Sequence, residues 1–141
     1  MEPKDFLKTV YLGDRACKRL LIDGWNGRIE LQVDVISRVR DPSGHWNFYT
    51  DEDINDGLIV FSNVSSIKLS PPGPVPNDYI NSFEVHPLDE KCDAEGCKQL
   101  YVFQLSVSSV DPQGNSREVC IDIVAEDVHL EDPQHPGVVI P

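Results

Sequence analysis

Apolar and polar residues alternate most clearly across residues 28–39. Such alternation places successive side chains on opposite faces of an extended chain, so it predicts a strand with one buried face. The residues expected on that face are Ile29, Leu31, Val33 and Val35. The next residue, Ile36, is also apolar and breaks the alternation. We therefore expect a β-bulge at this point.

Two further alternating segments predict a hairpin. Residues 98–110 and 117–125 each place apolar side chains at every second position. The stretch between them, 111–115, carries Pro early and Gly later, which is typical of a tight turn. The apolar residues expected to face the core are Tyr101, Phe103, Leu105 and Val107 in the first segment, and Val119, Ile121 and Ile123 in the second.

Shorter apolar segments predict additional strands. The segment 16–23 precedes a Gly-rich turn at 24–27, and the compact run 58–61 should be buried on both faces because it is apolar throughout. Residues 64–69 and 79–86 are also expected to be strands. The proline-rich stretch 71–76 cannot donate into a sheet ladder, so we expect a loop there.

Together these elements predict an all-β fold, mainly an antiparallel β-sandwich or a partly closed barrel, with at most one short helix. Residues 2–10 or 75–83 could supply that helical turn. The length of 141 residues favours a single globular domain spanning 1–141. Residues 132–141 hold three prolines and predict an irregular tail, whose apolar residues 138–140 are expected to contact the core.

The chain is strongly acidic. Its 24 Asp and Glu residues outnumber its 12 Lys and Arg residues, which gives a formal net charge of −12. Such a field repels phosphate backbones and anionic lipid surfaces, so we expect neither a nucleic-acid partner nor a membrane partner. A basic protein partner is favoured instead.

The hydropathy pattern indicates a cytoplasmic protein. No stretch of about 18 apolar residues is present. The first residues include Glu2 and Asp5, and their apolar run is short, which is not typical of a secretory signal. In a reducing compartment the four cysteines are expected to be thiols or metal ligands.

Two segments have partial metal-ligand patterns. Cys92 and Cys97 are spaced as half of a zinc site, with His86 upstream, but no second half-site follows. Cys17 and Cys120 lie alone in predicted strands and are expected to be small buried thiols. Residues 51–57 resemble the first half of a calcium loop, since Asp51, Asp53 and Asn55 alternate. Its later positions, however, hold Asp56 where Gly is needed and Ser62 where Glu is needed. We therefore predict no cofactor, with Cys92, Cys97 and His86 as weak metal candidates.

Catalytic motifs are not found in the sequence. The four histidines lie outside any recognisable nucleophile framework, and phosphate-binding glycine patterns are missing. A non-enzymatic role is therefore favoured. The residues most suited to a partner interface combine aromatic anchors with charge, because such residues dominate interface centres. They are Trp46, Tyr49, Asp51, Asp53 and Asp56.

Two other groups have plainer interpretations. Trp25 lies in a turn between predicted strands, where a Trp more often fills the edge of the core. The acidic residues near the C-terminal end are expected to form a solvated face, and the alternative is an electrostatic landing site for a basic protein. They are Asp122, Glu126, Asp127, Glu131 and Asp132.

Three runs resemble small acidic bacterial proteins: Tyr-Leu-Gly-Asp-Arg-Ala-Cys at 11–17, Ile-Asp-Gly-Trp at 22–25, and Tyr-Thr-Asp-Glu-Asp-Ile at 49–54. Some acidic all-β proteins of this size are similar to immunity proteins, which neutralise a co-produced toxin. The resemblance implies a non-enzymatic interaction protein and assigns no functional residue. The alternative is a β-sandwich that binds a metal or a small ligand.

Overall fold

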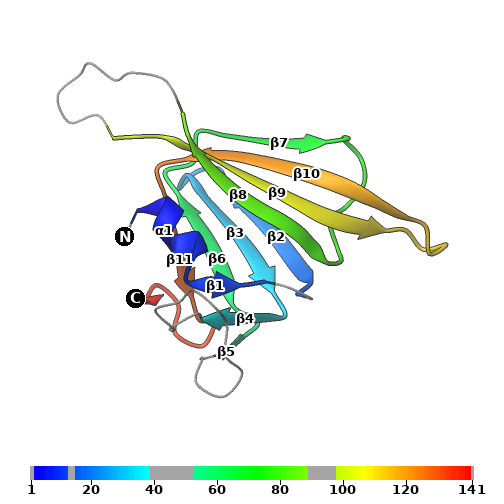
Figure 1. The fold of residues 1–141 in the computed structure, drawn as a ribbon, viewed down its shortest axis with the longest axis horizontal. Helices are drawn as coiled ribbons and strands as arrows, with labels where there is room; N and C mark the ends of the chain where they lie inside the picture. The colour runs from blue at the N-terminus through cyan, green and yellow to red at the C-terminus, as the bar shows by residue number, and fades with distance from the viewer. Residues whose placement is uncertain (1, 13–14, 39–52, 89–97, 141) are drawn as a thin grey trace.

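The computed structural model describes residues 2–12, 15–38, 53–88 and 98–140. These residues form one short helix and otherwise strands, so the predicted all-β class is confirmed (Figure 1). The elements are α1 (Pro3–Leu7), β1 (Val10–Tyr11), β2 (Cys17–Asp23), β3 (Arg28–Val33), β4 (Val35–Arg38), β5 (Asp53–Asn55), β6 (Leu58–Ser62), β7 (Ser66–Ser70), β8 (Ile80–Pro87), β9 (Tyr101–Val110), β10 (Ser116–Ala125), β11 (Asp127–Glu131) and β12 (Val139–Ile140).

The described strands pair into three antiparallel sheets. A four-stranded sheet has the order β7-β10-β9-β8, a five-stranded sheet has the order β12-β11-β6-β3-β2, and a small sheet has the order β1-β4-β5. The four- and five-stranded sheets form the two layers seen in Figure 1. Neither closes on itself, because each order runs from one edge strand to another.

The long hairpin β9–β10 forms as its pattern predicts. Its ten paired positions run from Ser116 opposite Val110 to Ala125 opposite Tyr101. Period-two alternation turns the apolar set inward, and Phe103, Leu105, Val107, Val119, Ile121 and Ile123 are all buried. The outward positions in the middle of both strands hold polar and small residues, with Val residues toward the ends.

The second layer supplies the facing apolar side chains. Ile29 on β3 lies opposite Phe61 on β6, and Phe61 lies opposite Val128 on β11. Phe61 also meets Phe103 of the other sheet edge to face, with ring centroids 5.1 Å apart. The two sheets therefore bury a shared core between them, as expected for a sandwich.

A break between strands replaces the bulge expected at Val35 and Ile36. The strand β3 ends at Val33, and β4 leaves the five-stranded sheet to pair with β1 and β5. Asp34 fixes this change of sheet, because its Oδ1 accepts a hydrogen bond from the Ala16 backbone N–H at 2.9 Å. Ile36 is fully buried on the new sheet. The second apolar residue in sequence therefore marks a switch between sheets.

The two ends of the chain pack onto the sheets. The helix α1 lies in one of the two segments considered for a helical turn, and its Phe6 is buried. Within the tail, β12 pairs with β11, and Ile140 packs against the core. Val138 and Val139 are exposed, so the contact expected for residues 138–140 is made by Ile140 alone. Across the four described ranges, no helix is long and apolar enough to cross a membrane.

Candidate functional site

The outer face of the four-stranded sheet carries a hollow of about 350 Å³. We call it the acidic hollow. Its lining residues are mainly short or acidic, and they come from the three adjacent strands β8, β9 and β10. They are Ser82, Glu84, Gln104, Leu105, Ser106, Glu118, Cys120 and Asp122. The lining set contains no Lys or Arg.

Strand alternation places these groups side by side. On β10, buried Val119 and Ile121 point inward, so Glu118, Cys120 and Asp122 point outward. The register of the three strands aligns their outward side chains in rows across the sheet. One row runs Glu84, Gln104, Asp122, and the next runs Ser82, Ser106, Cys120. The small residues of the second row leave the space that forms the hollow.

The acidic groups in the hollow are only partly engaged by other side chains. Glu118 accepts a hydrogen bond from the Ser106 hydroxyl, and the Glu84 carboxylate lies 3.3 Å from Nε2 of His86. Lys68 of the edge strand β7 lies opposite Asp122 in register. Acidic groups at this spacing on an open surface attract ammonium and guanidinium groups. Among the described residues there is no group of three or more metal ligands, so the hollow does not resemble a metal centre.

The position of Cys120 differs from expectation. It is exposed, whereas Cys17 is buried as predicted for a small thiol. The difference follows from alternation, because Cys120 stands between two inward-facing residues and must point outward. Burial also raises the pKa of the Cys17 thiol to about 11.

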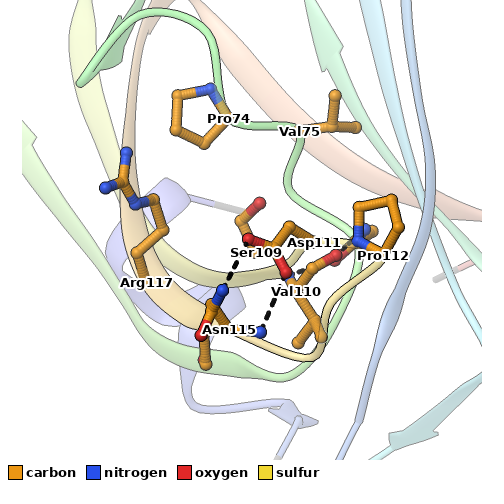
Figure 2. A pocket seen from close by; sticks show the side chains of 10 residues that line it. Pro74, Val75, Ser109, Val110, Asp111, Pro112, Asn115 and Arg117 are labelled. Carbon is orange, nitrogen blue, oxygen red and sulfur yellow. Dashed lines mark hydrogen bonds between the residues drawn. The ribbon is translucent and has the colours of Figure 1, made fainter.

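A second cavity, of about 590 Å³, lies at the tip of the β9–β10 hairpin. The loop between β7 and β8 supplies Pro74 and Val75, and the hairpin supplies Pro112, Asn115 and Arg117 (Figure 2). Its lining combines apolar residues with polar ones, one cation, Arg117, and one acid, Asp111. We call it the hairpin-tip cavity.

A charged network crosses the outer face of the five-stranded sheet. Arg28 donates two hydrogen bonds to the carboxylate of Glu131, at 2.9 and 3.0 Å, and a third to Glu30 at 2.9 Å. His129 Nε2 lies 2.5 Å from Glu131, and the backbone N–H of Gly137 donates to Glu131 at 3.1 Å. These charged groups pair with one another, so the network connects β3, β11 and the C-terminal segment. We therefore assign it a structural role.

Burial of Glu131 overturns its interpretation as a solvated acid. Its side chain is only 3% exposed. Hydrogen bonds from Arg28 lower its pKa to about 2, against the opposing effect of desolvation. The partner lies 103 residues away in the sequence, so a local acidic pattern could not reveal the pair.

A model of a family of unknown function, DUF6258, matches residues 1–141, the whole chain. The chain belongs to DUF6258. No curated protein and no solved structure shows a significant match to it. Membership in DUF6258 assigns no activity or ligand, so function must be argued from the surfaces described above.

The predicted partner-binding residues of this DUF6258 protein divide into two groups. Trp46, Tyr49 and Asp51 lie outside the described residues. Asp53 is on β5 and accepts a hydrogen bond from the Ser37 hydroxyl at 2.7 Å. Asp56 follows β5 and forms an ion pair with Lys18 at 2.6 Å. Both described acids therefore already have partners within the fold.

The remaining candidates of the sequence analysis are placed as follows. Cys92 and Cys97 lie outside the described residues, and the exposed His86 contacts Glu84. Trp25 was expected to fill the edge of the core, but it is 96% exposed in the turn between β2 and β3.

Sequence reasoning did not single out the acidic hollow. The signal was present in part, since Glu118, Cys120 and Asp122 all occupy the polar phase of a strongly alternating segment. The missing information was the neighbour order, which brings Glu84 of β8 beside Gln104 of β9. That order depends on how the whole sheet assembles.

Proposed function

We propose that this protein is a non-enzymatic interaction domain that binds a basic protein partner through the acidic hollow. The observation that carries the proposal is the arrangement of Glu84, Glu118 and Asp122 around a row of small side chains on an open sheet face. Basic side chains of a partner could enter the hollow and reach these carboxylates. The small side chains of Ser82, Ser106 and Cys120 let a partner's side chain come close to the sheet.

The overall charge supports the same class of partner. A net charge of −12 accelerates encounters with basic proteins, and local carboxylates then fix the orientation of the complex. The exposed carboxylate of Glu84 and the exposed Glu118 remain accessible to such a partner. An immunity-type role, in which the partner is a co-produced basic toxin, is the finer form of this proposal and rests on the sequence resemblance alone.

The test is affinity capture with the immobilised protein in lysate of its source cell. Wild type is compared with the triple variant E84Q/E118Q/D122N, which keeps side-chain size and removes three charges. We expect a stoichiometric basic partner on wild type at low salt, released at about 0.5 M salt because screening weakens exposed charge pairs. The triple variant should lose at least about tenfold in affinity for the identified partner.

A matched control separates the hollow from net charge. The variant D5N/E126Q/D132N also removes three charges, but from residues that do not line the hollow. It should retain the partner nearly as well as wild type. Equal retention by all three proteins, or equal loss by both variants, would contradict the assignment to the hollow. Capture of no protein at low salt would contradict the proposed function itself.

A further inference from the structure

The hairpin-tip cavity has the size and rigidity of a ligand site. Its volume of about 590 Å³ lies within the usual range for small-molecule pockets. The side chain of Asn77 holds the loop to the hairpin, because it donates to the Val110 carbonyl at 3.0 Å and accepts from the Val110 N–H at 2.8 Å. The cavity is therefore formed without a ligand.

Hydrogen bonds also hold the turn between β9 and β10. Asp111 accepts hydrogen bonds from the backbone N–H groups of Gln113 at 3.0 Å and of Asn115 at 2.9 Å. The Asn115 side chain also donates to Asp111, as Figure 2 shows. These contacts lower the pKa of Asp111, with the backbone N–H of Asn115 the largest cause, and the nearby charge of Arg117 lowers it further. The Asp111 carboxylate is thus occupied by its own turn.

Arg117 is an unusual residue at its position. It shares the alternation phase of the buried Val119 and Ile121 on β10, but it lies beyond the core and is exposed. In register it lies opposite Ser109 of β9, which is only 6% exposed. Among the described residues, no hydrogen bond is found for the guanidinium of Arg117 or the hydroxyl of Ser109, although the charge of Arg117 acts on the nearby Asp111 carboxylate. The exposed Arg117 and the buried Ser109 both line the cavity, so both can donate hydrogen bonds to a ligand there.

We infer that the hairpin-tip cavity binds an organic monocarboxylate, with Arg117 and Ser109 donating to the carboxylate and Pro74, Val75 and Pro112 contacting an apolar group. A guanidinium pairs with a carboxylate through two parallel hydrogen bonds, and Ser109 can supply another. The lining holds one cation, Arg117, and one acid, Asp111, on a chain of net charge −12, which favours a monoanion over a phosphate dianion. This site is separate from the proposed partner surface, because the acidic hollow is lined by other residues.

Two sources share this chemistry: a free small carboxylate and the C-terminal carboxylate of a peptide. The test titrates isotope-labelled full-length protein with phenylacetate, with a short peptide ending in Phe, and with the same peptide as its C-terminal amide. Backbone amide shifts at Val110, Asn115 and Arg117 report binding. Saturable shifts with phenylacetate alone assign the site to small carboxylates. Saturable shifts with the free-acid peptide alone assign it to peptide termini.

The amide peptide tests the charge directly. It should bind at least about tenfold more weakly than the free acid, because it lacks the anion that Arg117 recognises. Arg117→Gln should weaken binding of the free acid by at least about tenfold, and Ser109→Ala by severalfold. The control Arg19→Gln removes an exposed cation of β2 and should leave binding unchanged. Thermal melting confirms that each variant is folded.

Several results would overturn the inference. These are no saturable shift with either carboxylate, equal binding of acid and amide peptides, or undiminished binding by folded Arg117→Gln. Inorganic phosphate binding as tightly as the carboxylates would overturn the ligand class. Loss of the partner-binding activity of the acidic hollow would leave this result untouched, since the two assays use different residues.

Discussion

Cys17 and Cys120 occupy opposite environments although both lie in strands. Cys17 is 2% exposed beside the core, whereas Cys120 is exposed in the acidic hollow. The thiolate is the reactive form of cysteine, and burial both covers the Cys17 sulfur and raises its pKa to about 11. The two thiols should therefore differ in chemical reactivity.

We expect iodoacetamide to alkylate Cys120 in the native protein and to leave Cys17 unmodified at neutral pH. Peptide mapping by mass spectrometry distinguishes the sites. In denaturant both should react, which controls for peptide recovery. Modification of Cys17 at the same native rate as Cys120 would show that its strand opens readily or is exposed. A bound partner should also slow the reaction at Cys120 if it occupies the acidic hollow.

At the scale of elements, Gly57 joins the small sheet to the five-stranded sheet between β5 and β6. A Cβ atom placed there would lie 2.7 Å from Cδ1 of Ile36 and 3.2 Å from Cγ2 of Ile54. Both neighbours are branched side chains, and Ile36 is fully buried. The turn therefore requires the smallest residue because β4 passes so close to it.

Gly57→Ala should lower the free energy of unfolding by about 1–3 kcal/mol, the usual cost of overpacking a core. Urea unfolding measures this cost. The matched control is Gly24→Ala, since nothing lies within 4 Å of a Cβ at Gly24. Its effect should stay within about 0.5 kcal/mol. Equal stabilities for the two variants would show that Ile36 moves aside without cost.

The elements that sequence predicts are the long, periodic ones. The strands β3, β9 and β10 have enough alternating residues to show their period and buried faces. The strand β11 has only two inward apolar residues, Val128 and Leu130, within an acidic segment. Its pattern was too short to be distinguished from a solvated stretch.

The candidate sites depend on neighbours that local patterns do not encode. Alternation alone shows that Glu118 and Asp122 point outward. Only the order of strands in the sheet shows that Glu84 lies near them. Arg117 could be noticed in sequence as a charged residue in an apolar phase. Its place in a cavity depends on the loop that carries Pro74, which lines the same cavity although it is distant in sequence.

At the scale of the whole molecule, Glu131 connects three separate parts of the chain. Its contacts reach Arg28 on β3, His129 on its own strand and Gly137 in the C-terminal segment. The folded state therefore holds this carboxylate ionised far below its ordinary pKa, which falls from 4.5 to about 2. Folding is linked to its protonation, because the unfolded chain binds the proton more tightly.

The lowered pKa of Glu131 determines the pH range over which it stabilises the fold. A depressed carboxyl pKa stabilises the fold above the unfolded value of 4.5, and the stabilisation is lost as pH falls toward about 2. We expect Glu131→Gln to lower the free energy of unfolding by about 3 kcal/mol at neutral pH, since it leaves Arg28 without its anion. The deficit should shrink steadily below about pH 4.5.

Urea unfolding of wild type and Glu131→Gln across this pH range measures the difference between them. Both proteins share every other carboxylate, so changes in overall repulsion largely cancel and the difference isolates Glu131. Glu126→Gln is the control: it removes the same charge from a carboxylate that is 27% exposed, so its deficit at neutral pH should be smaller. A Glu131→Gln deficit that stays constant from neutral pH to about pH 3 would contradict an ionised Glu131 that holds β3, β11 and the C-terminal segment together.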